Sequence, residues 1–244
     1  MRVHRFYVNK PILEKGSVMT LSNSELLYQW RHVFRFNVGS FTTLFDNSGF
    51  EALCQIAELS FREASLLVVK KEQNTMLPRR EVFLYQSIIK GGNFDLVLEK
   101  CTELGVSHFV PVLSDRSEKK NINMERSLKI VKEASEQSGR GILPTMSEPV
   151  SLGDAVSSPL VNPIAFHPYG SPFRESKILP ARTTGIVQSG GNLESTSVLI
   201  GPEGGWSDRE ISLFEKKAIP LYSLGSTILR AETATIAATS LLLL

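Results

Sequence analysis

Hydrophobic and polar positions follow different patterns in the two parts of the chain. Up to about residue 72, short apolar runs alternate with turns. Residues 41–45 and 50–59 flank the turn cluster Asp46-Asn47-Ser48-Gly49, and residues 66–69 form another run rich in valine. One stretch in this region differs, because its apolar residues recur at helical spacing, at Leu26, Leu27, Trp30, Val33 and Phe34. Ser24 could cap this predicted helix. The pattern predicts a small β-barrel carrying one helix over residues 1–72.

Beyond a polar stretch at residues 70–80, predicted strands alternate with predicted helices. The strands are expected at residues 82–89, 106–113, 162–166, 197–200 and 219–224. The helices are expected to begin at Asn93, Asn123, Ser151, Ser207 and about Ala231. This alternation predicts an α/β domain with a largely parallel sheet over residues 73–244, which binds ligands at the carboxyl ends of its strands. Residues 168–191, rich in Pro, Gly and Ser, predict a loop.

Composition places the chain among ordinary globular proteins, with 42% apolar and 21% charged residues in 244. The net charge of +2 is too small to indicate a nucleic-acid partner. Residues 1–39, however, carry six Lys and Arg against only Glu14 and Glu25. That local excess of cations could attract phosphates, although an ordinary solvated face is an equally good interpretation.

Several classes of protein are disfavoured. Cys54 and Cys101 each lie in an apolar run, which predicts buried thiols rather than a disulfide framework or a zinc site. The four histidines are scattered without the spacing of metal ligands. The first residues lack the apolar core of a signal peptide, and the four final leucines fall far short of the ~20 residues that span a bilayer. We therefore expect a cytoplasmic protein without metal or membrane, whose last leucines form a buried helix end or cover a subunit interface.

The first candidate for chemistry is Gly-Pro-Glu-Gly-Gly, which begins at Gly201 between a predicted strand and a capped helix. Glycines let backbone amides approach a ligand, but such a turn can also bind nothing. The loop lacks the Lys-Ser/Thr of a phosphate loop and the dinucleotide pattern Gly-x-Gly-x-x-Gly. A nucleoside triphosphate or NAD is therefore disfavoured.

The second candidate is Leu-Gly-Ser-Thr-Ile-Leu-Arg-Ala-Glu-Thr-Ala, which begins at Leu224 and also leads from a strand into a helix. Glu232 or Thr233 could simply complete the helix N-terminus. Arg230, set between Leu229 and Ala231, should either pair with an acid or face an anionic ligand. His167 ends a predicted strand and could line the same site, or it could be an ordinary core or surface histidine.

Two further stretches are architectural when taken alone. Glu136 and Arg140 stand at helical spacing, so a simple ion pair is as good an interpretation as a function. Glu-Leu-Gly-Val, from Glu103, reads as a helix end followed by a strand. No Gly-x-Ser-x-Gly elbow is present, which argues against a hydrolase.

Taken together and in order, six stretches resemble one family. They are Arg2-Val-His-Arg-Phe-Tyr, His32-Val-Phe-Arg35, Glu103-Leu-Gly-Val106 with Pro111 and Arg116-Ser117, Glu136-Gln-Ser-Gly-Arg140, Gly201-Pro-Glu-Gly-Gly-Trp-Ser with Glu210, and Leu224-Gly-x-x-Ile-Leu-Arg-x-Glu-Thr-Ala234. The chain resembles the RsmE family of bacterial 16S rRNA uridine-N3 methyltransferases over nearly its whole length.

The resemblance implies a PUA-like RNA-binding domain at residues 1–72 and a SPOUT methyltransferase domain, with a deep trefoil knot, at residues 73–244. It also implies S-adenosylmethionine as cofactor, a homodimer, and 16S rRNA in the small ribosomal subunit as partner. Knots are almost absent from proteins generally, so no compositional pattern could have indicated one.

The expected site residues fall into three groups. The cofactor would contact His167, Ile200, Gly201, Glu203, Gly204, Gly205, Leu224, Gly225, Ile228, Leu229 and Thr233. RNA would contact Arg2, Arg5, Arg31, Arg35, Lys90, Arg116 and Arg140. Arg230 is the first candidate to stabilise a uracil anion and Arg140 the second, reaching across the dimer. Glu203 or Glu232 would take the proton or hold an arginine in place.

Three rival functions remain open. One is a SPOUT methyltransferase with another target, such as a ribose in tRNA or rRNA. Another is a catalytically inactive RNA-binding factor in ribosome assembly. The third, a nucleotide-binding regulator, would require a phosphate loop that this sequence lacks.

Overall fold

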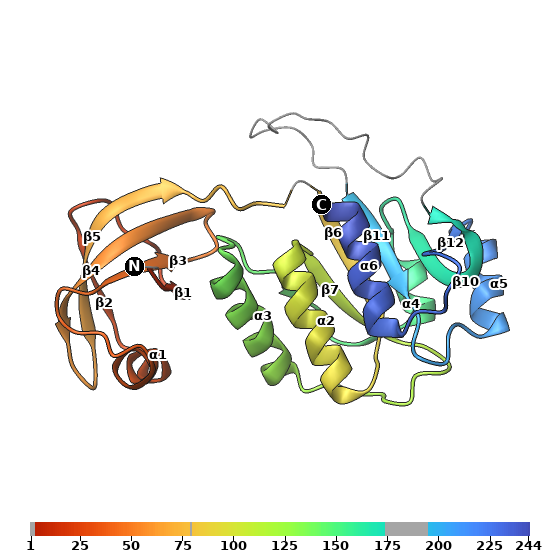
Figure 1. The fold of residues 1–244 in the computed structure, drawn as a ribbon, viewed down its shortest axis with the longest axis horizontal. Helices are drawn as coiled ribbons and strands as arrows, with labels where there is room; N and C mark the ends of the chain where they lie inside the picture. Colours follow the sequence, from red (N-terminus) through yellow and green to blue (C-terminus); the bar gives the residue numbers. More distant parts are fainter. Residues whose placement is uncertain (1–2, 79, 174–194) are drawn as a thin grey trace. The chain divides into compact units, whose positions relative to one another are not determined.

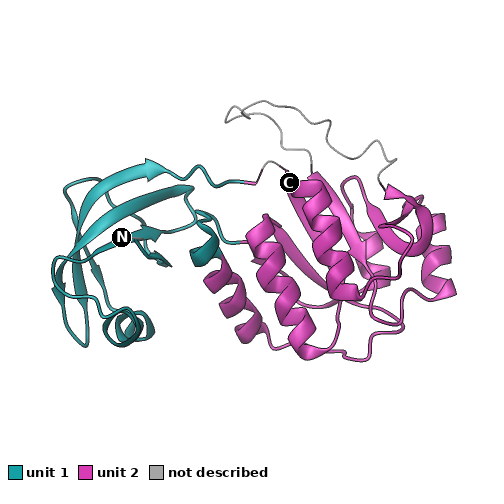
Figure 2. Ribbon diagram, viewed as in Figure 1, with its two compact units in different colours: residues 1–77, 135–143 teal, residues 78–134, 144–244 magenta. Residues whose placement is uncertain are grey.

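The computed structural model describes residues 3–78, 80–173 and 195–244, and the chain divides into two compact units. Unit 1 comprises Met1–Leu77 with Ser135–Leu143, and unit 2 comprises Pro78–Ala134 with Pro144–Leu244 (Figure 2). The predicted boundary at residue 72 lies within the last strand of unit 1, Ala64–Gln73. No local pattern could assign Ser135–Leu143 to unit 1, because its contacts are with residues far away in the sequence.

Unit 1 is built on a five-stranded sheet in the order β1-β3-β4-β5-β2. The strands are β1 (Arg5–Tyr7), β2 (Val18–Leu21), β3 (Phe41–Phe45), β4 (Phe50–Leu59) and β5 (Ala64–Gln73). β1 pairs with β3 in parallel and the other neighbours are antiparallel. The hairpin of β3 and β4 confirms the two strands predicted on either side of the turn cluster.

The helical segment of unit 1 differs from the prediction. α1 (Ser24–Tyr28) is capped by Asn23, whose Oδ1 accepts the amide of Leu26 at 3.0 Å, so the predicted cap at Ser24 is one residue late. The helix continues as a π-helix, η1 (Gln29–Val33). The wider π turn breaks the 3.6-residue spacing. Trp30 is consequently fully buried, whereas Val33 is exposed.

Unit 2 contains a second, seven-stranded sheet in the order β12-β10-β11-β6-β7-β8, with β9 also paired to β7. Its strands are β6 (Glu81–Ser87), β7 (His108–Leu113), β8 (Thr145–Met146), β9 (Val150–Ser151), β10 (Ile164–Pro172), β11 (Ser195–Ile200) and β12 (Leu221–Ser223). Every described pairing in this sheet is parallel, as expected.

Helices cover both faces of the parallel sheet (Figure 1). They are α2 (Gly91–Leu104), α3 (Met124–Ser138), α4 (Leu152–Ser157), α5 (Asp208–Lys216) and α6 (Ala231–Leu243). Successive residues of a strand point to opposite faces. Val198 and Ile200 therefore pack in the cluster formed by α2 and α6, while Leu199 packs in the cluster formed by α4 and α5. Both faces are buried here, which is why the second half of β11, Val198–Ile200, is continuously apolar.

Several predicted boundaries are confirmed and two need correction. Gly105 ends α2 with φ of 113°, and Ser207 with Glu210 forms a complete capping box for α5. However, α2 begins at Gly91, before the predicted cap at Asn93, because the amide of Asn93 already donates to Lys90 O.

The loop predicted for residues 168–191 is also wrong at its start. Residues 168–172 continue β10, where Ser171 pairs with Tyr222 of β12 across a register shift. Residues 174–194 lie outside the described part of the chain.

Cys54 and Cys101 are both buried and free, as predicted. Burial raises the pKa of each thiol to about 12. Among the described residues, no helix is long and apolar enough to cross a membrane. Those residues also contain no group of three or more His, Cys, Asp or Glu suited to a metal ion.

Candidate active site

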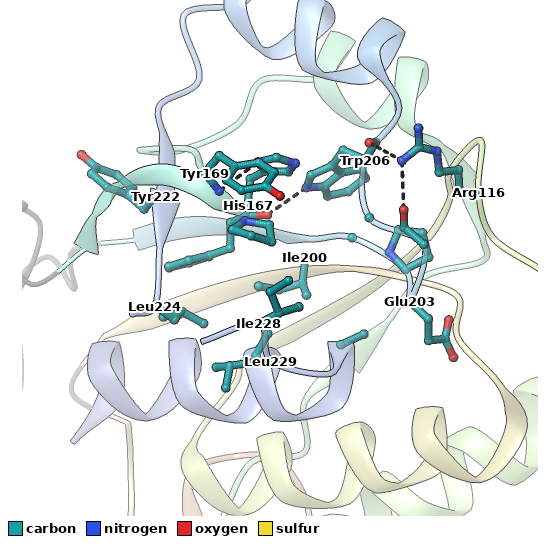
Figure 3. A pocket seen from close by; sticks show the side chains of 18 of the residues that line it. Arg116, His167, Tyr169, Ile200, Glu203, Trp206, Tyr222, Leu224, Ile228 and Leu229 are labelled. Atoms are coloured by element: carbon teal, nitrogen blue, oxygen red, sulfur yellow. Dashed lines mark hydrogen bonds between the residues drawn. The ribbon is translucent and has the colours of Figure 1, made fainter. Parts of the chain in front are cut away.

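A pocket of about 320 Å³ lies at the carboxyl ends of β11 and β12 and beside the middle of β10 (Figure 3). Its walls come from residues 166–169 and 200–206, from residues 222, 224–225 and 227–229, and from Arg116 and the first turn of α6. Parallel strands present their carboxyl ends at one edge of a sheet, so the loops after β11 and β12 converge there, next to residues 166–169 of β10. Aromatic side chains of His167, Tyr169 and Trp206 lie on one side of the pocket, opposite Ile200 and Ile228.

Trp206 fixes the loop that follows β11. Its indole Nε1 donates to Phe166 O at 3.0 Å, which ties this loop to β10. A Cβ atom at Gly201 would stand 3.2 Å from the indole ring. A side chain at Gly201 would therefore push against Trp206, so the glycine allows close packing of the indole in addition to any role in exposing backbone to a ligand.

Arg116, from the loop after β7, holds the same loop from outside. One of its guanidinium nitrogens, Nη1, donates to Gly204 O at 3.0 Å and to Trp206 O at 3.1 Å. A Cβ atom at Gly204 would lie 3.2 Å from Arg116 Cβ, so the glycine permits this approach. The structure thus gives Arg116 an internal contact that the sequence did not predict.

Glu210 provides a second connection between the loop after β7 and the loop after β11. It is 2% exposed, and its carboxylate accepts the amide of Ser207 at 2.7 Å and the amide of Asp115 at 2.8 Å. Asp115 in turn forms an ion pair with Arg209, which lowers the pKa of the Asp115 carboxyl. The loop 201–206 is therefore preorganised by contacts within the protein.

Glu203 points away from the centre of the pocket (Figure 3). Its Oε1 accepts the backbone amide of Lys90 at 3.0 Å, and Lys90 is the residue that caps α2. The carboxylate therefore connects the pocket loop to the beginning of that helix.

The loop from Leu224 to Leu229 forms the opposite wall. Leu224, Ile228 and Leu229 give it an apolar surface, and Gly225 has φ of 144°, which side chains rarely allow. Within the described part of the chain, the amides of residues 225–229 form no hydrogen bond. Apolar side chains beside unpaired backbone groups fit a flat purine, which needs apolar contact on its faces and hydrogen bonds at its edge.

His167 contributes a neutral imidazole to the pocket. Burial, reinforced by the positive charge of Arg116, lowers the pKa of this histidine. Its Nδ1 accepts the amide of Tyr169 at 3.3 Å. The neutral ring therefore carries its proton on Nε2, where it is available as a donor.

Ten of the eleven predicted cofactor residues line the pocket, and Thr233 does not. Arg230 and Glu232 also lie outside the lining, although Leu229 and Ala231 beside them are part of it. Arg230 is exposed, and no ion pair of its side chain is found among the described residues. Glu232 is 8% exposed, and its Oε2 meets no donor in the described structure.

The predicted RNA-binding residues of unit 1 have varied surroundings. Arg5 pairs with Glu51 and also donates to Gly139 O. Arg31 lies 3.3 Å from the ring centroid of Phe61, and Arg35 is exposed with φ of 54°. Burial lowers the pKa of Arg140 to about 10.

Two predicted RNA-binding residues remain. Lys90 of unit 2 is exposed, and its Nζ lies 3.1 Å from the carboxylate of Glu118. Arg2 lies outside the described residues.

Several lining residues were not predicted from the sequence. Trp206 directly follows the glycine loop, and Phe166 and Tyr169 flank His167, so proximity in sequence could have indicated them. Tyr222 and Thr227 reach the pocket only because β12 pairs with β10. No local pattern contains that pairing.

Comparison with known proteins gives one consistent family. A family model described as RNA methyltransferase domain matches residues 75–243. A ribosomal RNA small subunit methyltransferase E from Synechocystis is 36% identical, over 89% of this chain and 70% of the relative.

Two solved structures share the fold over nearly the whole chain. A methyltransferase from Legionella pneumophila, in complex with its bound cofactor SAM, has a TM-score of 0.85 at 27% identity and covers 99% of this chain and 97% of its own. A ribosomal RNA small subunit methyltransferase E from Neisseria gonorrhoeae, bound to S-adenosyl methionine, has a TM-score of 0.84 at 25% identity. The match covers 98% of this chain and 96% of that one.

Proposed function

The chain belongs to the RNA methyltransferase family of ribosomal RNA small subunit methyltransferases E, and on this premise we propose that it methylates N3 of a uridine in 16S rRNA. S-adenosylmethionine is the methyl donor. The observation that carries the proposal is the pocket beside β10 and the ends of β11 and β12, with its apolar wall and unpaired backbone amides. Relatives that share this fold over nearly their whole length have been solved with that cofactor.

The residues of the pocket would hold the cofactor in a defined orientation. The loop 201–206 is fixed by Trp206, Arg116 and Glu210, so binding does not require the loop to be ordered first. Amides of residues 225–229 would bind the edge of the adenine between Leu224 and Ile228. When bound, the sulfonium cofactor supplies an activated methyl group. Orientation of the two reactants can lower the barrier by ~7–11 kcal/mol in favourable systems.

The second requirement is to stabilise the uracil as its imide proton leaves. Arg230 is exposed beside the pocket wall and engages no acid among the described residues. Its guanidinium would donate to a uracil carbonyl as negative charge develops there. Arg140, from unit 1, is the second candidate for this role, from the partner subunit of a homodimer.

The two acidic candidates differ in what they already bind. Glu203 accepts the amide of Lys90, and we assign it the role of holding α2 against the pocket loop. Glu232 has a buried oxygen without a donor among the described residues, and a substrate N–H would satisfy it. We therefore propose Glu232 as the acceptor of the imide proton.

The finer architecture belongs to the same proposal. Residues 1–72 would form a PUA-like RNA-binding domain, and residues 73–244 a SPOUT domain with a trefoil knot at the cofactor site. The enzyme would act in the cytoplasm as a homodimer on the small ribosomal subunit. Support comes from the family resemblance and from TM-scores above 0.8 along nearly the whole chain.

Mass spectrometry of the nucleosides of 16S rRNA tests the function directly. Purified protein and cofactor are incubated with 16S rRNA and, separately, with small subunits from cells that lack the enzyme. We expect one N3-methyluridine, absent when cofactor is omitted. A methylated ribose, or methylation of tRNA alone, would identify a different methyltransferase. Cofactor binding by calorimetry without transfer to any RNA would indicate an inactive RNA-binding factor.

A further inference from the structure

A second pocket, of about 590 Å³, lies in unit 2 where two long helices begin. α2 contributes its first turns on one side, and the start of α3 with the preceding loop contributes the other. None of its lining residues belongs to the lining of the cofactor pocket. Its lining includes Gly91, Gly92 and Asp95 of α2, Lys119 of the loop, and Arg126 and Ser127 of α3.

The beginnings of both helices favour an anion. Lys90 caps α2 without a side-chain hydrogen bond. The amides of Gly91 and Gly92 bind no acceptor in the part of the chain that the structure describes. Each helix N-terminus carries roughly half a positive charge, and unpaired amides there are donors aimed outward. At α3 the side chain of Asn123 already accepts the amide of Arg126 at 3.0 Å, so α2 supplies the open amides and α3 adds its dipole to a site that favours negative charge.

Side chains add donors without matching acceptors. Ser127 is 2% exposed and lines the pocket, and its hydroxyl forms no hydrogen bond among the described residues. Lys119 Nζ lies 3.2 Å from the position of a Cβ at Gly91 and pairs with no described carboxylate. Arg126 is already bound to Asp95, with Nε and Oδ2 2.9 Å apart. The positive charge of Lys119 therefore remains uncompensated.

The two glycines have no structural explanation. Neither has φ in the left-handed region, and a Cβ at Gly92 would meet no atom within 4 Å. At Gly91 it would meet only the mobile end of Lys119. Glycine in a helix costs roughly 0.5–1 kcal/mol relative to alanine. Open access to the backbone amides explains why both positions lack a side chain.

The pocket is also connected to the cofactor site. Lys90, which precedes Gly91, donates its amide to Glu203 of the cofactor loop at 3.0 Å. We propose that this second pocket binds a backbone phosphate of the RNA substrate, close to the nucleotide that is methylated. The volume admits a phosphate together with part of its ribose. This inference rests on the proposed function, because it identifies how the same substrate is held.

A matched pair of lysine variants tests the proposal. Lys119→Ala should weaken binding of a 16S rRNA fragment roughly tenfold and reduce the slope of log K against log salt by about one. Lys120→Ala removes the same charge at the neighbouring exposed position, which is outside the lining, and should change affinity far less. Binding is measured on the full chain by fluorescence anisotropy at several KCl concentrations, with cofactor affinity as the control for folding.

Substitution of Gly92 distinguishes a phosphate site from a merely structural role of the glycine. Gly92→Ala should raise the melting temperature, because alanine favours the helix, and yet weaken RNA binding, because its methyl group covers the amide. Higher stability with unchanged RNA affinity would contradict the proposal. Ser127→Ala should also weaken RNA binding while the cofactor still binds normally.

The outcomes separate this inference from the function on which it rests. If the wild type methylates 16S rRNA but Lys119→Ala and Lys120→Ala behave alike, the phosphate site is wrong and the function stands. If the wild type binds and methylates no rRNA, the function itself fails. Inorganic phosphate, compared with chloride at equal ionic strength, should compete with RNA for the wild type and less for Lys119→Ala. Equal competition in both proteins would overturn the site.

Discussion

Arg230 shows how strongly a single residue's role depends on its surroundings. Its position between Leu229 and Ala231 suggested either an ion pair or an anionic ligand. The structure places it exposed at the start of α6, and the described residues offer it no acid. An unpaired arginine beside a pocket is free to bind a group that develops negative charge.

Removing the guanidinium should therefore affect turnover and not cofactor binding. For Arg230→Ala we expect a dissociation constant for S-adenosylmethionine near that of the wild type and a turnover lower by roughly 10²-fold or more. Arg230→Lys should recover only part of the loss, because lysine cannot donate in a fork. Calorimetry and single-turnover kinetics give the two quantities. Near-normal turnover in Arg230→Ala would exclude the role.

His167 should make cofactor binding depend on pH. Its folded-state pKa lies below the ordinary 6.5, so the neutral ring is favoured at neutral pH and the proton binds more readily once the chain is unfolded. The contribution of this histidine to the stability of the folded state is fully present above pH 6.5. It is lost as the pH falls from 6.5 toward the lowered pKa. The same protonation would place a second cation beside a sulfonium.

We accordingly expect cofactor affinity to decline as the pH falls through the folded-state pKa of His167, which lies below 6.5. His167→Asn should flatten that decline while keeping a polar side chain. Titration calorimetry across this range, at constant ionic strength, measures both proteins. An identical decline in the variant would assign the effect to another group.

At the scale of elements, capping contacts fix the loops that form the pocket. Ser207 and Glu210 could be recognised as a capping box from sequence, because the box needs only neighbouring residues. The second bond of Glu210, from the amide of Asp115, could not be recognised, since β7 and β11 become neighbours only through β6. That bond turns a local helix cap into a link between two loops.

Glu210→Ala should accordingly reduce the stability of the protein by more than the loss of an ordinary helix cap does. Two amides in partly buried hydrogen bonds lose their acceptor, and we expect the free energy of unfolding to fall by about 2–4 kcal/mol. Glu215→Ala, an exposed position on the same helix, should change it by less than about 0.5 kcal/mol. Denaturation followed by circular dichroism measures both variants. Equal stability of the two variants would show that the Asp115 contact contributes little.

At the scale of the whole molecule, charge near the N-terminus does not act as one patch. Arg5 is held by Glu51 and Gly139 O inside unit 1, whereas Arg35 is exposed. In the sequence, Arg5 and Arg35 belong to the same cation-rich stretch, residues 1–39. Only the structure distinguishes a cation used for packing from one available to a phosphate.

The two arginines should then give different phenotypes. Arg35→Ala should lower the salt slope of RNA binding by about one, with unchanged thermal stability. Arg5→Ala should lower stability first, because the partly buried carboxylate of Glu51 loses its ion pair and keeps only the hydrogen bond from Asn74. Salt-dependent RNA binding and thermal melts, run on both variants, separate the two effects. A changed salt slope for Arg5→Ala with unaltered melting would reverse this assignment.

The sequence alone determined what local patterns can encode. Each of these patterns depends on neighbouring residues, and each prediction made from one is confirmed. They are the strands β3 and β4, the end of α2 at the left-handed Gly105, the capping box of α5 and the buried cysteines. The order of the six motifs indicated the family. Most of the predicted cofactor residues also line one pocket, because they lie directly after strands.

Only the tertiary structure decided which of these residues meet. The pairing of β12 with β10 brings Tyr222 to the pocket, and Ser135–Leu143 joins unit 1 through distant contacts. The second pocket exists because the beginnings of α2 and α3 lie together. Such neighbours are fixed by burial of both faces of a parallel sheet, and this long-range packing leaves no periodic trace in the sequence.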